Sequence, residues 1–117
     1  MIDLIVTKLK TGPVKAVVPF GSTIPAGTYT VVKEEPTGLG FTRYRVITHM
    51  AVGQSDALRM HCKKTVYDLL AWKPIKGTGS DTRVCVLTPL GIGQLTTTNS
   101  DGTISQEAVF SFAEMSY

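Results

Sequence analysis

The stretch TYTVVKEEPTGLGFTRYRVITHMA, residues 28–51, decides the fold expected for this chain of 117 residues. Its first part, residues 28–35, is rich in β-branched and aromatic side chains, which favour a strand. A proline and two glycines at residues 36–40 predict a loop. Residues 41–51 then alternate: one face carries Phe41, Arg43 and Arg45, and the other, which has no charge, is the expected core face. Because the connection is only about five residues long, we expect an antiparallel hairpin.

Two helices are expected, one before and one after this hairpin. Residues 2–10 have an apolar spacing that fits a short helix, although a strand would also accommodate it. The second helix is longer, about residues 56–72, with Ser55 placed to cap its start and Pro74 just beyond its end. Its apolar side chains repeat at helical spacing along one side: Leu58, Cys62, Val66, Leu69 and Leu70.

Further extended runs complete the chain at residues 83–88, 90–98 and 104–117. Apolar side chains of both parities in residues 83–88 predict burial on both faces of that strand. The turn residues 99–102 predict a tight hairpin between the last two runs. The whole chain, residues 1–117, is therefore expected to be one α+β domain. Its mainly antiparallel sheet of about four to five strands would have the long and the short helix packed on one face.

Charge and apolar content exclude some classes of protein. Twelve basic residues against nine acidic ones give a net charge of +3, which is weaker than the clustered excess of a sequence-reading nucleic-acid binder. The longest apolar runs, such as residues 16–20, are far shorter than the roughly 20 residues of a membrane helix. No signal peptide is recognisable, so we expect a soluble intracellular protein whose Cys62 and Cys85 are reduced thiols, without a membrane partner.

The residue types that perform chemistry do not form a known catalytic or metal-binding pattern. Glu34 and Glu35 are adjacent on an expected strand, so their carboxylates should point to opposite faces and not share a site. The soft metal ligands lack the spacing of a metal site: His49, His61, Cys62 and Cys85. We therefore expect no enzyme, with no catalytic residues, no cofactor and no metal.

The alternating face of residues 41–51 invites two interpretations. Phe41 with Arg43 and Arg45 is similar on a small scale to a platform that binds nucleic acid. Because no further aromatic residues are interleaved with these cations, a face that is solvated or contacts another subunit is favoured.

Three segments together carry a resemblance to a known family. They are YTVVKEEP at residues 29–36, the strand 43–49 leading through Gly53 and Ser55 to a helix ending VYDLL at 66–70, and DGTI at 101–104 followed by VFSF at 109–112. In order and spacing the chain from Gly27 to Tyr117 resembles the tail-terminator, or tail-completion, family of long-tailed bacteriophages. The proline-rich segment of residues 13–25 and the short first helix depart from the family pattern.

This resemblance implies a structural protein of the virion tail and neck, present in the host cytoplasm during assembly. It implies a homo-oligomeric ring, a hexamer, that ends tail-tube polymerisation and joins the tail to the head-completion complex. The implied partners are the tail-tube protein and a head-completion or connector protein, with transient, non-specific contact with DNA in the channel. Another head–tail connector, a tail-tube protein, and a small nucleic-acid-binding module remain alternatives. The residues expected at subunit interfaces are Phe41, Arg43, Arg45, Lys76, Thr78, Asp81, Thr97, Asn99 and Asp101.

Overall fold

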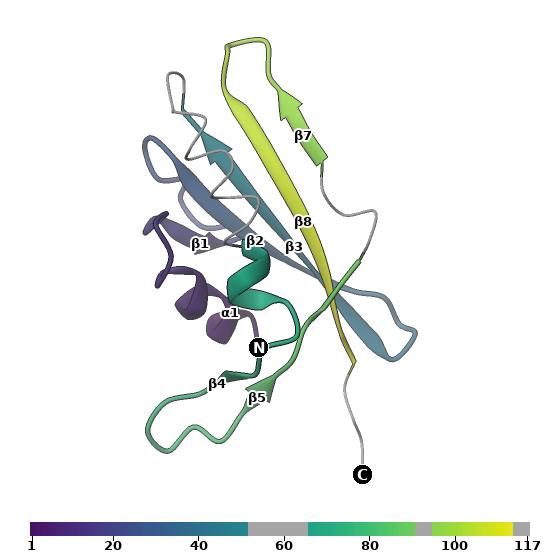
Figure 1. Cartoon of the computed structure of the whole chain (residues 1–117). Helices are drawn as coiled ribbons and strands as arrows, with labels where there is room; N and C mark the ends of the chain where they lie inside the picture. The colour runs from purple at the N-terminus through teal and green to yellow at the C-terminus, as the bar shows by residue number, and fades with distance from the viewer. Residues whose placement is uncertain (52–65, 91–94, 114–117) are drawn as a thin grey trace.

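The computed structural model describes residues 1–51, 66–90 and 95–113 of the chain. Its elements are shown in Figure 1: α1 (Ile2–Leu9), β1 (Val17–Pro19), β2 (Tyr29–Pro36), β3 (Phe41–Met50), β4 (Ile75–Lys76), β5 (Val84–Cys85), β6 (Thr88–Pro89), β7 (Leu95–Thr98) and β8 (Ile104–Ala113). A second helical segment covers residues 66–70.

One six-stranded sheet organises these elements. Its strands lie in the order β1-β2-β3-β8-β6, and β7 pairs with the beginning of β8 while β6 pairs with the end of β8. The β1–β2 pair is parallel, and the other pairs in this sheet are antiparallel. Strands β4 and β5 form a separate two-stranded sheet. The long strands β3 and β8 therefore form the middle of the fold.

The predicted hairpin of residues 28–51 is confirmed. Strands β2 and β3 pair antiparallel from Tyr29 opposite His49 to Pro36 opposite Thr42. The uncharged face of β3 is buried as expected, with its Tyr44 and Val46 side chains almost inaccessible to solvent. The predicted hairpin between the last two strands is also present, because residues 99–102 connect the paired strands β7 and β8.

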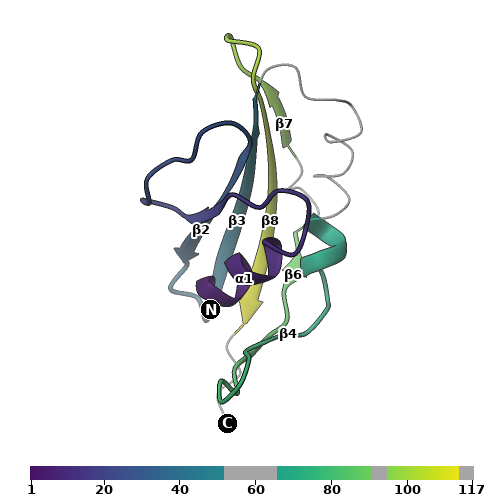
Figure 2. The same cartoon turned by 90° about the vertical axis from the view of Figure 1, so that its left-hand side faces the viewer.

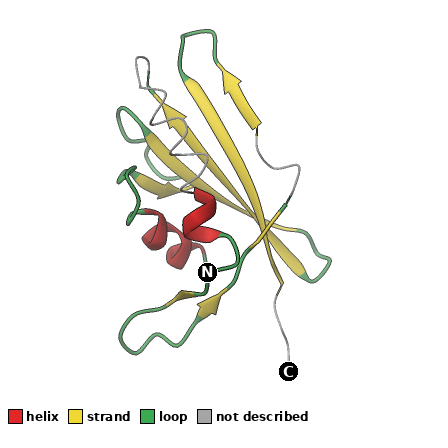
Figure 3. Cartoon of the chain, viewed as in Figure 1, coloured by secondary structure: helices red, strands yellow, loops and turns green. Residues whose placement is uncertain are grey.

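The hydrophobic core lies on one face of the sheet, under α1 and the helical segment 66–70. Figures 2 and 3 show both helical segments on this side of the strands. From α1, Leu4, Ile5 and Leu9 join the core, as the apolar stripe of a short amphipathic helix predicts. They pack with residues of the six-stranded sheet, of the second helical segment and of the region from β4 to Leu87: Val17, Val32, Tyr44, Val46, Leu70, Ile75, Cys85, Leu87, Ala108 and Phe110.

The predicted fold class is wrong. The described chain is a small, mostly sheet domain with 44% strand and 14% helix, its sheet has six strands instead of four to five, and it contains no long helix. Short strands account for part of the difference. Strand β1 is only three residues long and ends at Pro19, and the amide of Thr30 donates to the carbonyl of Ala16 and the amide of Phe20 to the carbonyl of Val32. Such pairing depends on a neighbouring strand, which local propensity does not encode.

The helix predicted at about residues 56–72 lies largely outside the described residues, because residues 56–65 are not among them. Residues 66–70 are helical, but the helix does not reach Trp72 as predicted. Trp72 has a φ of 61°, in the left-handed region that ends helices, and its amide donates a 2.9 Å hydrogen bond to the carbonyl of Leu87. Contact with a distant segment thus terminates this helix before Pro74.

The prediction that residues 83–88 form one strand buried on both faces is also wrong. The segment divides into β5 and β6 around an isolated bridge at Leu87. Cys85 and Leu87 are fully buried, whereas Val84 and Val86 are 48% and 42% exposed. The described elements cover only one side of this segment, so apolar character at both parities did not indicate two buried faces.

Candidate functional site

The face of the sheet opposite α1 is the first candidate for a functional surface. Within residues 1–51, 66–90 and 95–113 no helix covers this face (Figure 2). Register places alternate residues of the three central strands on this uncovered face: Tyr29, Val31, Lys33 and Glu35 of β2, Phe41, Arg43, Arg45, Ile47 and His49 of β3, and Ser105, Glu107, Val109 and Ser111 of β8. Except for the buried Val109, these side chains are half-buried.

Arg45 occupies the centre of the uncovered face and pairs with two carboxylates. Its Nε donates a 2.9 Å hydrogen bond to Glu35 on β2, and its Nη1 donates to Glu107 on β8. The hydrogen bond from Arg45 holds the pKa of Glu35 below its usual range, and Glu35 in turn raises the pKa of Arg45. One guanidinium therefore links three neighbouring strands.

Two other cations on this face lack a carboxylate partner among the described residues. The Nε of Arg43 is covered by neighbouring atoms and has no hydrogen-bond acceptor there. The Nζ of Lys33 lies 4.9 Å from the centre of the Phe20 ring, a cation–π contact, instead of in an ion pair. The uncovered face therefore carries positive charge that its own acidic residues do not neutralise.

A groove of 410 Å³ lies at the end of this face beside the segment that follows β1. Its floor comes from the sheet, where the rings of Tyr29 and His49 stack with their centres 5.1 Å apart. Its wall includes Phe20 and Ile24, which are 65% and 66% exposed. Large apolar side chains left in water beside an open sheet are typical of a surface that receives another molecule.

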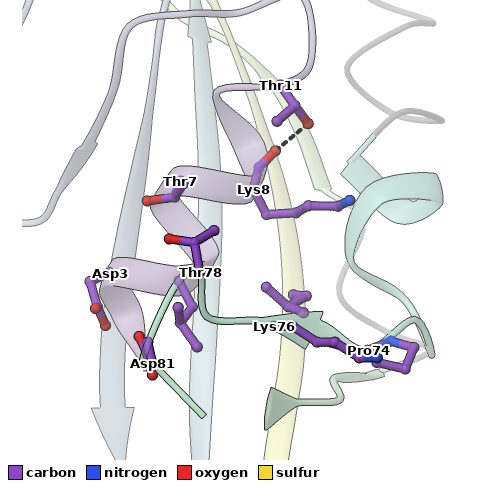
Figure 4. A pocket seen from close by; sticks show the side chains of 10 residues that line it. Asp3, Thr7, Lys8, Thr11, Pro74, Lys76, Thr78 and Asp81 are labelled. Carbon is purple, nitrogen blue, oxygen red and sulfur yellow. Dashed lines mark hydrogen bonds between the residues drawn. The ribbon is translucent and has the colours of Figure 1, made fainter. Parts of the chain in front are cut away.

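A second cavity, of 460 Å³, lies between α1 and the β4–β5 loop on the covered side of the sheet. Figure 4 shows Asp3 and Asp81 at one end of it, with Lys8 extending towards the other. Arg83 pairs with both carboxylates, its Nη2 lying 2.6 Å from Asp3 and 2.7 Å from Asp81. These hydrogen bonds hold the pKa values of the two aspartates well below their usual range and raise the pKa of Arg83. The cluster is a clasp between the N-terminal helix and a loop 80 residues away, in which each charge has a partner.

The turn between β7 and β8 is the third candidate. Asn99 lies at its start and its side-chain amide donates to Thr103 and Ser105, which stiffens the turn. The carboxylate of Asp101 is exposed and accepts a 2.5 Å hydrogen bond from the Thr103 hydroxyl and a 3.0 Å bond from the Thr103 amide. These bonds lower the pKa of Asp101, so the turn presents a fixed negative charge to solvent.

The structure thus places the predicted interface residues at three separate places. Phe41, Arg43 and Arg45 share the uncovered face; Lys76, Thr78 and Asp81 line the cavity beside α1; Thr97, Asn99 and Asp101 belong to β7 and its turn. Sequence reasoning missed the partners of these residues. The hairpin register could have placed Glu35 beside the arginines, but the pairs Arg45–Glu107 and Arg83–Asp3 join segments that are 62 and 80 residues apart.

Neither a metal site nor a reactive thiol is found among the residues that the structure describes. They contain no group of three or more His, Cys, Asp or Glu side chains able to hold a metal ion. Cys85 is fully buried, and this burial raises the pKa of its thiol to about 11, so it behaves as a small apolar side chain. Over the same residues, no helix has the length and apolar character needed to cross a membrane.

No protein-family model and no curated protein sequence matches the chain.

Proposed function

We propose that this chain is a structural subunit which assembles with copies of itself through the uncovered face of its sheet. Its assembly is a closed ring, a hexamer, that ends polymerisation of the tail tube in a long-tailed bacteriophage and joins the tail to the head-completion complex. The phage role is based on the resemblance of residues 27–117 to tail-terminator proteins, and the assembly role on the geometry of the chain.

The observation that carries the assembly role is the composition of the uncovered face. Half-buried aromatic and aliphatic side chains, such as Tyr29, Val31 and Ile47, lie beside a row of charged groups on the same strands. Protein interfaces combine an apolar centre with a charged and polar rim in this way. A sheet with one face covered by α1 and the other open also provides the two different patches that a ring requires.

The arrangement of charge supports a structural role over a catalytic one. The carboxylates of Asp3, Asp81, Glu35 and Glu107 each accept from an arginine, so they are engaged in holding segments together. A general acid or base needs a carboxylate whose pKa is raised towards neutrality, whereas the pKa of Glu35 is lowered. These groups suit a rigid building block.

Native mass spectrometry and electron microscopy of the purified full chain test the proposal. At high micromolar concentration we expect a closed ring with the mass of a hexamer. Ile47→Glu places an unpaired charge in the middle of the uncovered face and should leave a folded monomer. Leu39→Glu is the matched control, because Leu39 is 79% exposed in the β2–β3 loop and its replacement should leave the ring intact. A wild-type chain that remains a monomer, or an Ile47→Glu chain that still assembles, would contradict the proposal.

Two neighbouring roles differ from a terminator in how the assembly ends. A tail-tube protein polymerises into open filaments, and a head–tail connector binds the head in the absence of tubes. Electron microscopy of the chain mixed with tail-tube protein distinguishes them, because a terminator caps tubes at one end and limits their length.

A second candidate function, binding of single-stranded nucleic acid, is favoured by the aromatic pairs on the same face. The Tyr29–His49 stack and the Lys33–Phe20 contact are groups on which bases can stack. This role predicts DNA or RNA binding that weakens steeply with salt and is lost in the Tyr29→Ala variant. Binding that is absent at low salt excludes it.

A further inference from the structure

The unneutralised positive charge of the uncovered face raises the question of which acidic group would meet it. Lys33, Arg43 and Arg45 are three cations on this face, and Arg45 takes up both of the face's acids, Glu35 and Glu107. Arg43 is left with a covered Nε that has no acceptor among the described residues. Three cations against two acids leave positive charge in excess on this face, so the face is complementary to a carboxylate from another molecule.

Few described acidic groups of this chain are free to supply that carboxylate. Asp3, Asp81, Glu35 and Glu107 are all bound to arginines. Asp101 differs because it is exposed at the tip of the β7–β8 turn, which Figure 1 shows projecting at one extremity of the molecule.

The remaining described acids are less well placed than Asp101. Glu34 is exposed on β2 with its side chain on the opposite parity from the uncovered face, and Asp68 is exposed on the helical segment beside α1. Glu34 and Asp68 both lie on the body of the molecule, so a neighbour's sheet would have to approach with its whole face to reach them. The carboxylate of Asp101 is ionised and oriented by Thr103 before any partner arrives, which reduces the entropy lost on binding.

Asp101 cannot reach Arg43 of its own chain. Arg43 is opposite Ser111 on β8, and the strand from Ile104 to Ser111 alone spans about 24 Å at 3.4 Å per residue. The Asn99–Gly102 turn and Arg43 therefore lie far apart on one molecule, so a contact between them requires two copies of the chain. Contacts between two different patches of identical subunits are head-to-tail contacts, which form a ring when the rotation from one subunit to the next closes.

We infer that the Asn99–Gly102 turn of one copy docks on the uncovered sheet face of the next, with Asp101 paired to Arg43. This inference rests on the proposed self-assembly and names the two surfaces that meet in it. The β7–β8 hairpin is the projecting element, and the half-buried Phe41 beside Arg43 provides apolar contact next to the ion pair.

Two charge reversals and their mixture test the pairing. Arg43→Glu places like charges at every interface when assembled alone, and so does Asp101→Arg. Each should require at least about tenfold more protein for half-assembly in analytical ultracentrifugation. In an equal mixture the reversed tip of one variant meets the reversed face of the other, and the native tip meets the native face. The mixture should therefore regain assembly that neither variant shows alone.

Matched controls separate a specific pair from a change in net charge. Lys10→Glu and Glu34→Arg make the same charge changes at exposed positions away from both surfaces and should assemble like the wild type. Circular dichroism confirms that each variant is folded. Because Arg43 is half-buried, Arg43→Gln serves if the glutamate variant does not fold, and Asp101→Arg at the exposed tip gives a separate measurement.

The possible outcomes distinguish this inference from the proposed function. If the wild type assembles and both reversals assemble equally well, the pairing is refuted and the ring stands. If the reversals dissociate the ring but their mixture does not restore it, each residue meets some other group and the pairing is again refuted. A wild type that is monomeric at all concentrations overturns self-assembly and the pairing together.

Discussion

Three phenylalanines offer a test of where the stability of this protein resides. Phe110 on the central strand β8 is fully buried and its ring centre lies 5.3 Å from that of Tyr67 in the helical segment 66–70. Truncating a buried phenylalanine to alanine costs about 3–5 kcal/mol, which combines lost burial with the cavity that remains. Phe112, half-buried at the edge of the same core, should lose less. Phe20, 65% exposed, should lose no more than about 1 kcal/mol together with its contact to Lys33.

Urea and thermal unfolding of the three alanine variants measure these costs. At about 3–6 °C per kcal/mol for a chain of this size, Phe110→Ala should lower the melting temperature by about 10–30 °C and Phe20→Ala by no more than about 6 °C. The measurements are made at protein concentrations where the chain is monomeric, because assembly would add to apparent stability. The reasoning is refuted if Phe20→Ala destabilises as much as Phe110→Ala, or if Phe110→Ala costs less than about 1 kcal/mol.

Two further predictions concern polar contacts. The lowered pKa values of Asp3 and Asp81 mean that their pairing with Arg83 stabilises the fold fully above the usual aspartate value of about 3.9, and that this stabilisation is lost progressively as the pH falls from there through the lowered values. The difference in urea midpoint between wild type and Arg83→Gln should therefore be present at pH 7 and shrink by pH 2.5, and a constant difference would contradict the clasp. The hydroxyls of Thr30 and Thr48 are 3.1 Å apart in the core, so Thr48→Val should cost about 1–3 kcal/mol by orphaning its partner. Thr30→Val with Thr48→Val should cost less than the sum of the single changes, and additive costs in this double-mutant cycle would argue against the pair.

Local pattern was sufficient for the β2–β3 hairpin and for the turn that joins β7 to β8. Alternation with a period of two identified Tyr44, Val46 and Met50 as core residues, because a strand with one buried face must place its apolar groups on that face. Turn residues located both connections, since glycine adopts the positive φ that these turns require, as Gly40 and Gly102 do at 87° and 86°. These features depend on neighbours within a few residues along the chain.

The candidate surface could be predicted only in part. That Phe41, Arg43 and Arg45 share a face follows from their spacing alone, and the structure agrees. Two other features depend on β8 lying beside β3. Among the described residues no helix covers this face, and Arg45 binds both nearby carboxylates while the Nε of Arg43 has no acceptor. The residue pattern of one strand does not predict which distant segment will pair with it.

By itself the sequence determined the parity of the long strands and the positions of the tight turns, because each is an energetic preference of adjacent residues; for residues 2–10 it left a helix and a strand open. Tertiary structure alone decided that the fold is mostly sheet, that short strands complete it, and that the helix of residues 66–70 ends before Trp72. The physical reason is that strand pairing and ion pairs such as Arg83–Asp3 gain their free energy from groups far apart in the chain. Only the folded arrangement brings those groups within reach of one another.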